Sequence, residues 1–343
     1  MKQRHINIPI FIPHMGCPNA CVFCNQRSIS GHTDFRFENV EREIEEALST
    51  ISAEDSCEIA FFGGSFTGID RGLMVSLLEL AQKYIDSGRV GSIRLSTRPD
   101  YINSEILDIL GRYGVRNVEL GLQSMDDGVL AASRRGHTAK QAEEACQMIK
   151  ERGFSLVGQM MVGLPGSDAE KEMLTAERIC AMGADGARVY PTVVFYDTEL
   201  ADMSERGEYM PLDTKTAVER TKNVLDIFDR HGVPCIRVGL CAGENLSDRS
   251  KVLGGASHSA IGELAMGELY FDRICRELDQ RGIRGGELRI YVAKGNVSKA
   301  IGQKKKNKER ICEKYGIRKL KVLEKNSIMS YNIVLEHFVT EER

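Results

Sequence analysis

The 343-residue sequence contains no tryptophan, no long apolar run and no strong excess of charge of either sign. The missing tryptophan supports no functional conclusion. No segment approaches the ~18 consecutive apolar residues of a membrane-spanning helix, so no membrane protein is expected. The formal net charge of −3 gives no global signal for nucleic-acid binding. Any such activity must therefore depend on a local basic patch.

A secretion signal is also missing from the sequence. The N-terminal segment MKQRHINIPIFIPHMG lacks the apolar core and the small-residue cleavage site of a signal peptide. We therefore expect a cytoplasmic protein, in which the ten cysteines stay reduced. Cysteines that cluster in such a sequence become candidates for metal binding.

Short strand-like runs alternate with amphipathic helical patterns over residues 1–240. The runs are nearly continuous in apolar residues, which is typical of strands buried on both faces of a parallel sheet. They lie at 6–13, 57–64, 92–97, 116–121, 154–163 and 186–191. This rhythm predicts an α/β fold, a partial (β/α)6 TIM-type barrel with right-handed crossovers. A doubly wound open sheet has the same rhythm and remains the structural alternative.

Three cysteines, Cys17, Cys21 and Cys24, follow the first expected strand in the segment CPNACVFC. Pro18 and Asn19 favour a turn, and barrel enzymes hold their reactive groups in loops at the C-terminal ends of strands. Three thiolates without an obvious fourth ligand fit a [4Fe–4S] cluster with one open iron. Structural zinc, which takes four ligands, and three cysteines in an apolar core remain as alternatives.

The CxxxCxΦC pattern, with Phe23 as its aromatic residue, resembles the signature of radical S-adenosylmethionine (SAM) enzymes. The resemblance implies that Cys17, Cys21 and Cys24 are the catalytic residues and hold a [4Fe–4S] cluster, with Phe23 in the cofactor site. It also implies that the open iron binds SAM and that one electron cleaves SAM to methionine and a 5′-deoxyadenosyl radical. The electron would come from a reductant such as flavodoxin or ferredoxin.

The second expected strand ends in FFGGSFTG, which resembles the GGE-type loop of the same family. Gly63 and Gly64 would let the backbone approach the cofactor closely. Ser65 replaces the usual acidic residue, so the resemblance implies a contact through backbone carbonyls. An ordinary turn between a strand and a helix is the alternative.

Later strand ends supply further candidate cofactor residues. Ser96 ends the third strand. Gln123 and Arg135 lie in ELGLQSMDDGVLAASRRGHT, which resembles a block shared by the Elongator catalytic subunit and the oxygen-independent coproporphyrinogen oxidases. The resemblance implies that Arg135 pairs with the SAM carboxylate and that Gln123 contacts SAM or its ribose. Gln159, a polar residue in an apolar strand, needs a partner and could hold the ribose, with Met161 beside it.

Substrate contacts are expected from Arg188 and Tyr190, near the end of the last strand, and from His258 in a glycine-rich loop. Simple packing is the alternative for the first two residues. A structural place at the entry of a helix is the alternative for His258. Cys241 lies in the same region, and the sequence does not say whether it takes part in catalysis.

The phrases ARVYPTVVFYDTEL and GGASHSAIGEL resemble the Elongator catalytic-subunit group over most of residues 1–275. We expect no acetyltransferase domain within these 343 residues, so the acetyl-CoA-dependent activity of that group is not carried over. The coproporphyrinogen oxidases are the main rival. They usually carry another cysteine where Gln26 stands here.

Residues 241–343 are expected to form a smaller α+β extension. Its segment 286–323 has the order strand, helix, basic loop, helix, strand and resembles a KH module, whose GxxG loop clamps nucleotide backbone. Gly302 begins this loop and Lys305 replaces its second glycine. The basic residues of the segment are Lys299, Lys304, Lys305, Lys306, Lys308 and Arg310. We expect Lys304, Lys305 and Lys306 to contact RNA phosphates, with a solvated helix face as the alternative.

The sequence thus predicts a radical SAM enzyme with a [4Fe–4S] cluster and SAM, acting on RNA as a tRNA-modifying enzyme. A radical SAM enzyme acting on a small molecule, as the coproporphyrinogen oxidases do, is one alternative. A non-catalytic RNA-binding protein with an iron–sulfur cluster is the other.

Overall fold

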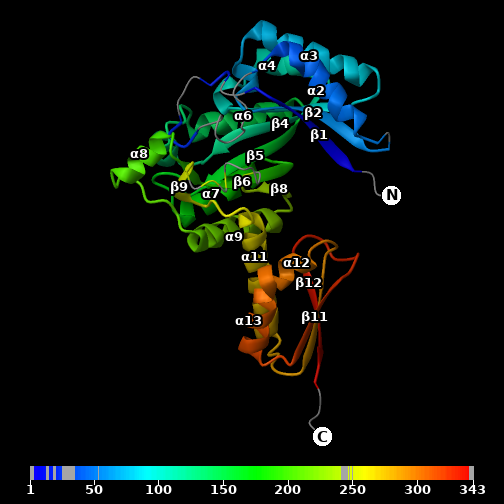
Figure 1. Cartoon of the computed structure of the whole chain (residues 1–343), viewed down its shortest axis with the longest axis vertical. Helices are drawn as coiled ribbons and strands as arrows, with labels where there is room; N and C mark the ends of the chain where they lie inside the picture. The colour runs from blue at the N-terminus through cyan, green and yellow to red at the C-terminus, as the bar shows by residue number, and fades with distance from the viewer. Residues whose placement is uncertain are drawn as a thin grey trace.

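The computed structural model describes residues 4–12, 15–17, 21–24, 35–52, 54–240, 246, 248 and 250–339. Its larger part is a curled sheet of seven parallel strands (Figure 1). The strands are β1 (His5–Phe11), β2 (Ser56–Phe62), β3 (Ser92–Thr97), β4 (Val115–Gln123), β5 (Ser155–Val162), β6 (Gly186–Pro191) and β8 (Cys235–Val238).

The order of the strands in the sheet decides between the two expected folds. It follows the chain, β1-β2-β3-β4-β5-β6-β8, without a reversal. A doubly wound sheet reverses its strand order at a switch point, so that alternative is excluded. The expected partial TIM-type barrel is confirmed. It has one strand more than predicted, because the four residues of β8 are too short and too mixed in polarity to stand out as an apolar run.

The two faces of the sheet differ in chemistry. Alternate strand residues, such as Leu95 on β3 and Leu120 on β4, belong to the large apolar core. Their neighbours Arg94 and Glu119 point to the opposite, inner face of the half-barrel. A closed TIM barrel fills its inner positions with branched apolar side chains. Charged residues at these positions therefore mark the inner face as the place to look for a site.

The helices that accompany the barrel strands are α2 (Phe37–Ser49), α3 (Arg71–Asp86), α4 (Ser104–Arg112), α5 (Asp127–Ala132), α6 (Ala139–Glu151), α7 (Ala169–Ala181), α8 (Glu199–Glu205) and α9 (Thr214–Arg230). β7 (Val193–Phe195), directly after β6, pairs antiparallel with β9 (Val252–Gly255), which comes after β8. No helix in the described ranges is long and apolar enough to cross a membrane.

The C-terminal residues form the expected α+β module. Its segment 286–323 contains strand, helix, loop, helix and strand in the predicted order, and an additional strand, β12, completes a sheet of order β11-β10-β12. The elements are β10 (Glu287–Val292), α12 (Val297–Ile301), α13 (Lys306–Tyr315), β11 (Lys319–Glu324) and β12 (Ile333–Phe338).

The long helix α11 (Ile261–Gln280) joins the module to the barrel (Figure 1). Its first half packs against α9 through Ala265 and Leu269, and its second half packs under the C-terminal sheet through Ile274 and Leu278. Because α11 contributes to both apolar clusters, the proposed boundary between residues 240 and 241 stays a prediction.

Candidate active site

The three cysteines of the expected cluster lie where β1 ends. Cys17 is exposed, Cys21 is buried and Cys24 is half-buried, and none of them forms a disulfide. The backbone N–H of Cys24 donates to the carbonyl of Cys21 at 3.0 Å, so these two residues close one turn. The Cys17 Sγ lies 3.5 Å from the Ser65 Oγ at the end of β2.

Val22 anchors this loop to the barrel. Its N–H donates to the carbonyl of Ser133, and its carbonyl accepts from the N–H of Leu200 at 2.8 Å. Its side chain is buried in an apolar cluster with Val194, against which Phe23 also packs. The signature aromatic residue therefore has a packing role in this structure, and its place in the cofactor site stays a prediction.

Glycines allow the cysteine loop and the loop after β2 to touch. A Cβ on Gly64 would lie 2.4 Å from the Met15 carbonyl oxygen, and one on Gly16 would lie 2.3 Å from the Ser65 carbonyl oxygen. Gly63 has φ of +99°, which side chains rarely allow. The structure thus gives these glycines a loop-packing role that the sequence did not suggest. A contact of Gly63, Gly64 or Ser65 with SAM stays a prediction.

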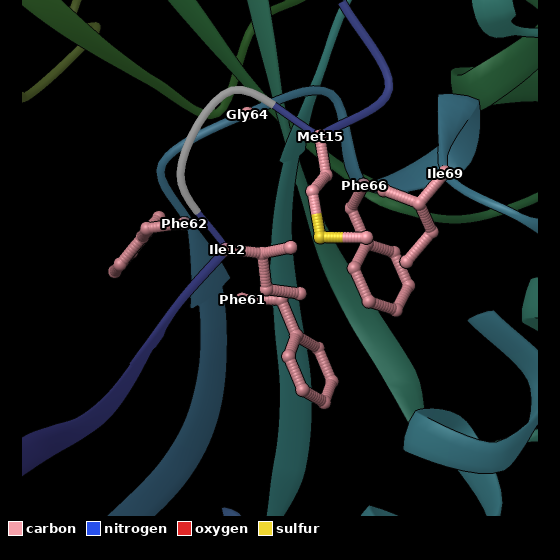
Figure 2. Close-up of a pocket in the computed structure, with 7 residues that line it drawn as sticks. All are labelled: Ile12, Met15, Phe61, Phe62, Gly64, Phe66 and Ile69. Atoms are coloured by element: carbon pink, nitrogen blue, oxygen red, sulfur yellow. The ribbon is translucent and has the colours of Figure 1, made fainter. Parts of the chain in front are cut away.

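The pocket beneath this loop contact is not a ligand site. Its lining is apolar, and it is too small to admit a water molecule. It is lined by Ile12, Met15, Phe61, Phe62, Gly64, Phe66 and Ile69 (Figure 2). The rings of Phe61 and Phe66 stack with their centroids 4.5 Å apart. In Figure 2 the Phe62 side chain points away from these two rings, and on its own side it lies under the Arg188 guanidinium.

Two buried guanidinium groups meet at the Cys21 sulfur. The Arg135 Nη1 lies 3.3 Å from Cys21 Sγ, and its Nη2 donates to the carbonyl of Gly121 at 2.6 Å. The Arg98 Nη1 lies 3.7 Å from the same sulfur. Buried cations require a negative partner. A thiolate that ligates an iron–sulfur cluster would provide one, so these residues fit a cluster bound at Cys21.

Among the described residues, no three His, Cys, Asp or Glu side chains lie so that they could hold one metal ion. Zinc requires such convergence of its ligands on a single centre. A [4Fe–4S] cluster does not, because each thiolate can bind a different iron.

Two features of Gln123 are typical of a site residue: a strained backbone and a buried side-chain oxygen without a hydrogen-bond partner among the described residues. Its φ of +67° is unusual for a residue other than glycine, and it ends β4 at an irregularity in the pairing with β5. Its Oε1 is buried and has no hydrogen-bond partner among the described residues. Strained backbone of this kind gathers at functional sites. An unsatisfied buried acceptor fits a ligand that donates, as a ribose hydroxyl does.

Three of the predicted site residues converge on one carboxylate that the prediction missed. Glu119 is 1% exposed. It accepts from Gln159 Nε2 at 3.0 Å, from Arg188 Nη2 at 2.7 Å and from Ser96 Oγ at 3.5 Å. A usable signal was present in the sequence, because Glu119 is a charged residue inside an apolar strand. In the sheet Ser96 is its direct neighbour.

The polar row continues across the inner face. Arg94 donates to Glu119 at 2.9 Å and also binds Glu58 on β2. Burial raises the pKa of Glu58, but hydrogen bonds from His5 and Arg94 outweigh that effect, and the pKa lies below its ordinary value. Glu58 therefore stays ionised, and opposite charges alternate from β2 to β6.

The remaining predicted residues separate into two groups. Tyr190 and Met161 are paired neighbours on β6 and β5, two residues beyond the pair of Arg188 with Gln159. Burial raises the pKa of Tyr190, so its hydroxyl stays protonated. His258 instead opens α11, where its Nδ1 accepts from the Ala260 N–H at 3.1 Å. This contact fits the helix-entry alternative, and a substrate contact of His258 stays a prediction. Cys241 lies outside the described residues.

Comparison with known proteins identifies the family. The Radical SAM superfamily matches residues 11–179, and the Radical_SAM C-terminal domain matches residues 184–270. The chain belongs to the radical SAM superfamily. Its cofactors are therefore a [4Fe–4S] cluster and SAM, and the protein is an enzyme of this class.

Among curated proteins, this radical SAM chain resembles the tRNA uridine(34) acetyltransferase of Methanocaldococcus jannaschii. The two are 31% identical over 182 residues, which cover 47% of this chain and 34% of that protein. Elongator complex protein 3 of Schizosaccharomyces pombe is 26% identical over 254 residues, covering 62% of this chain and 47% of that protein. The chain thus spans between a third and a half of the length of these relatives.

The fold of the radical SAM chain also has a solved counterpart. The archaeal Methanocaldococcus infernus Elp3 with an N-terminal deletion superposes with a TM-score of 0.60 and 20% identity. The match covers 83% of this chain and 65% of that one. At this identity the likeness concerns the fold, and it agrees with the partial barrel described above.

Proposed function

We propose that this radical SAM enzyme acts on RNA, with tRNA as its substrate class. Support comes from the curated relatives, which are named as tRNA uridine acetyltransferase and Elongator proteins. The observation that carries the proposal for this chain is an exposed lysine loop, Lys304–Lys306, whose last residue is also the first residue of α13. A cytoplasmic location and a low-potential reductant such as flavodoxin or ferredoxin complete the proposal.

Within the barrel, the proposal assigns roles to residues that the structure describes. Cys17, Cys21 and Cys24 would hold the cluster, and Arg135 would attract the carboxylate of SAM. Gln123 would accept a hydrogen bond in the buried space where its Oε1 now lacks a partner. When bound, the cluster and SAM supply a 5′-deoxyadenosyl radical, which takes a hydrogen atom from the substrate.

Further from the cysteines, Ser96 and Gln159 would be oriented by Glu119. Arg188 and Tyr190 would face the substrate from β6. The row of charges on the inner face holds these polar groups in fixed positions before a ligand arrives. Preorganised groups of this kind lose little entropy when they bind.

The lysine loop has an unusual backbone. Lys304 and Lys305 have φ of +54° and +65°, the left-handed region that normally requires glycine. Lys305 stands where the GxxG loop of a KH module has its second glycine. Each such residue costs about 1–2 kcal/mol relative to glycine. A strained pair of exposed lysines is more informative than a run of lysines on a helix face, because strain of this kind is typical of functional loops.

Not all cations of the basic segment are available to RNA. Arg310 pairs with Glu268 at 2.7 Å and stacks on the ring of Phe271. The Lys299 Nζ donates to Asn296. Lys304, Lys305 and Lys306, in contrast, are exposed. Lys308 is half-buried, so the three exposed lysines are the best placed for the proposed phosphate contacts.

The loop lies close to the barrel along α11. Ile261 and Gly262, at the start of this helix, contact the end of β8. Six residues after Ile261, the carbonyl of Gly267 accepts a hydrogen bond from Asn307 in the first turn of α13. At 1.5 Å per residue this separation is about 9 Å along the helix. An RNA backbone held at the lysines would therefore lie near the end of β8, at the opposite side of the sheet from β1.

Replacing Lys304, Lys305 and Lys306 together with alanine should weaken RNA binding and flatten its dependence on salt. If each lysine contacts one phosphate of a single strand, the slope of log K against log salt should fall by about 2. Binding to labelled tRNA at several salt concentrations measures both effects. As a control of equal charge, Lys319, Lys321 and Lys325, which are exposed on and after β11, are replaced in the same way. An unchanged slope in the loop variant would remove the proposed phosphate contacts.

Replacing Lys305 alone with glycine should raise the stability of the protein and weaken its binding to RNA. Glycine adopts the left-handed conformation freely, so the free energy of unfolding should rise by about 1 kcal/mol. RNA affinity should fall, because the ammonium group is lost. Lys305→Ala should lower affinity without the gain in stability. Urea unfolding and tRNA binding are measured on both variants. Tighter tRNA binding by Lys305→Gly would count against the proposed contact.

A further inference from the structure

Arg98 is a buried arginine that neither the sequence prediction nor the comparisons with known proteins single out. It follows directly on β3, and its side chain is 4% exposed. Its Nε and Nη2 donate to the carboxylate of Asp100 at 2.9 and 3.1 Å. Its Nη2 also donates to the carbonyl of Arg135. With these contacts in place, Nη1 points to Cys21 Sγ at 3.7 Å.

The guanidinium of Arg98 carries a positive charge. An arginine side chain stays protonated in proteins, and the Asp100 carboxylate pairs with this guanidinium at 2.9 Å. His137, whose side chain packs beside Asp100, adds no positive charge. Burial and the charge of Arg135 lower its pKa to about 4. The cationic environment of Cys21 is therefore provided by Arg98 and Arg135.

We propose that Arg98 is a positioning residue that sets the reduction potential of the cluster through its hydrogen bond to the Cys21 sulfur. This inference rests on the proposed role of Cys21 as a cluster ligand and does not depend on the RNA substrate. The reaction concerned is the transfer of one electron from a low-potential donor to the cluster, with no bond made or broken. Positive charge and hydrogen bonds at a cluster sulfur stabilise the more negative, reduced state and raise the potential.

Asp100 should affect the reduction potential of the cluster in the opposite direction to Arg98. Its carboxylate holds Arg98 in place and offsets part of the guanidinium charge at the sulfur. Removing the negative charge with Asp100→Asn should leave more positive charge beside Cys21. The potential should then rise, whereas removal of the Arg98 charge should lower it. A merely structural role for the pair would not give shifts of opposite sign.

The test uses full-length protein reconstituted with iron and sulfide under anaerobic conditions, without SAM or RNA. Arg98→Met, Arg98→Lys, Asp100→Asn and Arg134→Met are compared with the wild type. Iron content reports whether the cluster forms, and electron paramagnetic resonance during a redox titration gives the potential. Arg134 is a matched control, because its side chain is 61% exposed and lies one residue from Arg135.

Arg98→Met should lower the ratio of reduced to oxidised cluster at least tenfold at a fixed potential. This corresponds to about 59 mV for one electron. Arg98→Lys should recover part of the shift, Asp100→Asn should shift the potential upward, and Arg134→Met should match the wild type. The inference would be overturned if fully loaded Arg98→Met had the reduction potential of the wild type. It would also be overturned if Arg98→Met and Asp100→Asn shifted that potential in the same direction.

Two further outcomes separate the inference from the proposed function. If Arg98→Met fails to load, Arg98→Gln, which keeps a donor but no charge, replaces it in the comparison. A wild-type potential in that variant overturns the role of Arg98. If the wild type itself binds no iron, the proposed cluster at Cys17, Cys21 and Cys24 fails, and the role of Arg98 fails with it.

Discussion

Replacing Cys24 with alanine should abolish both the iron–sulfur cluster and the formation of 5′-deoxyadenosine. Cys24 is half-buried, and its backbone N–H, which closes the turn with Cys21, is kept in the variant. The substitution therefore removes the thiolate without removing the turn. Two remaining thiolates leave two irons of a [4Fe–4S] cluster without a protein ligand, so the cluster should not be retained. Iron analysis, the absorbance of the cluster and chromatography of the SAM products measure the outcome.

Cys312→Ala is the matched control for this substitution. Cys312 lies on α13, packed against the apolar cluster of the C-terminal module, and is also outside any disulfide. Its replacement should leave iron content and product formation at the wild-type level. A full cluster in Cys24→Ala, with 5′-deoxyadenosine formed at the wild-type rate, would refute the assignment of the three cysteines.

Replacing Glu119 with alanine should destabilise the barrel by about 3–5 kcal/mol. The carboxylate is buried between Arg94 and Arg188, whose side chains are 11% and 10% exposed. Without it, two guanidinium groups remain in a poorly hydrated place with less negative charge to balance them. Since small proteins are stable by only about 5–15 kcal/mol, the loss is a large part of the total. Urea unfolding of the protein without cofactors measures it.

Glu105→Ala is the control, because the same change is made at an exposed ion pair. Glu105 is 71% exposed and lies 3.3 Å from Arg71. Pairs of this kind contribute about 0–1 kcal/mol, so the control should unfold nearly as the wild type does. Equal, small effects of Glu105→Ala and Glu119→Ala would contradict the view of Glu119 as the residue that organises the inner face.

Most of the fold could be predicted from the sequence, because strands that are buried on both faces appear there as apolar runs. The six runs became β1 to β6, and the basic segment gave the predicted order of strands and helices. Four strands were missed for a physical reason. β7 has three residues and β9 has four. β8 has four residues, and β12 has only one fully buried position, Leu335, among exposed neighbours. Short or half-exposed strands depend on pairing partners, which a single sequence does not reveal.

The parts of the candidate site that depend on the spacing of residues in the sequence could be predicted. The parts that depend on contacts between distant segments could not. The cysteine spacing singled out the three candidate ligands directly. The close packing of Gly64 against the Met15 backbone was not predicted. Glu119 and Arg98 were missed because their roles appear only when strands far apart in sequence lie side by side. A charged residue in an apolar strand, as at Glu119, is the signal that could have been used.

The central claim, a radical SAM enzyme acting on RNA, is tested most directly by the yield of 5′-deoxyadenosine. The reconstituted and reduced protein is incubated anaerobically with SAM, alone, with total cellular RNA, and with the same RNA after ribonuclease treatment. The account predicts formation that rises with intact RNA and falls again after the treatment. Formation that is indifferent to RNA, as expected for a small-molecule substrate, would contradict the RNA claim. No formation despite an intact cluster would contradict the radical chemistry itself.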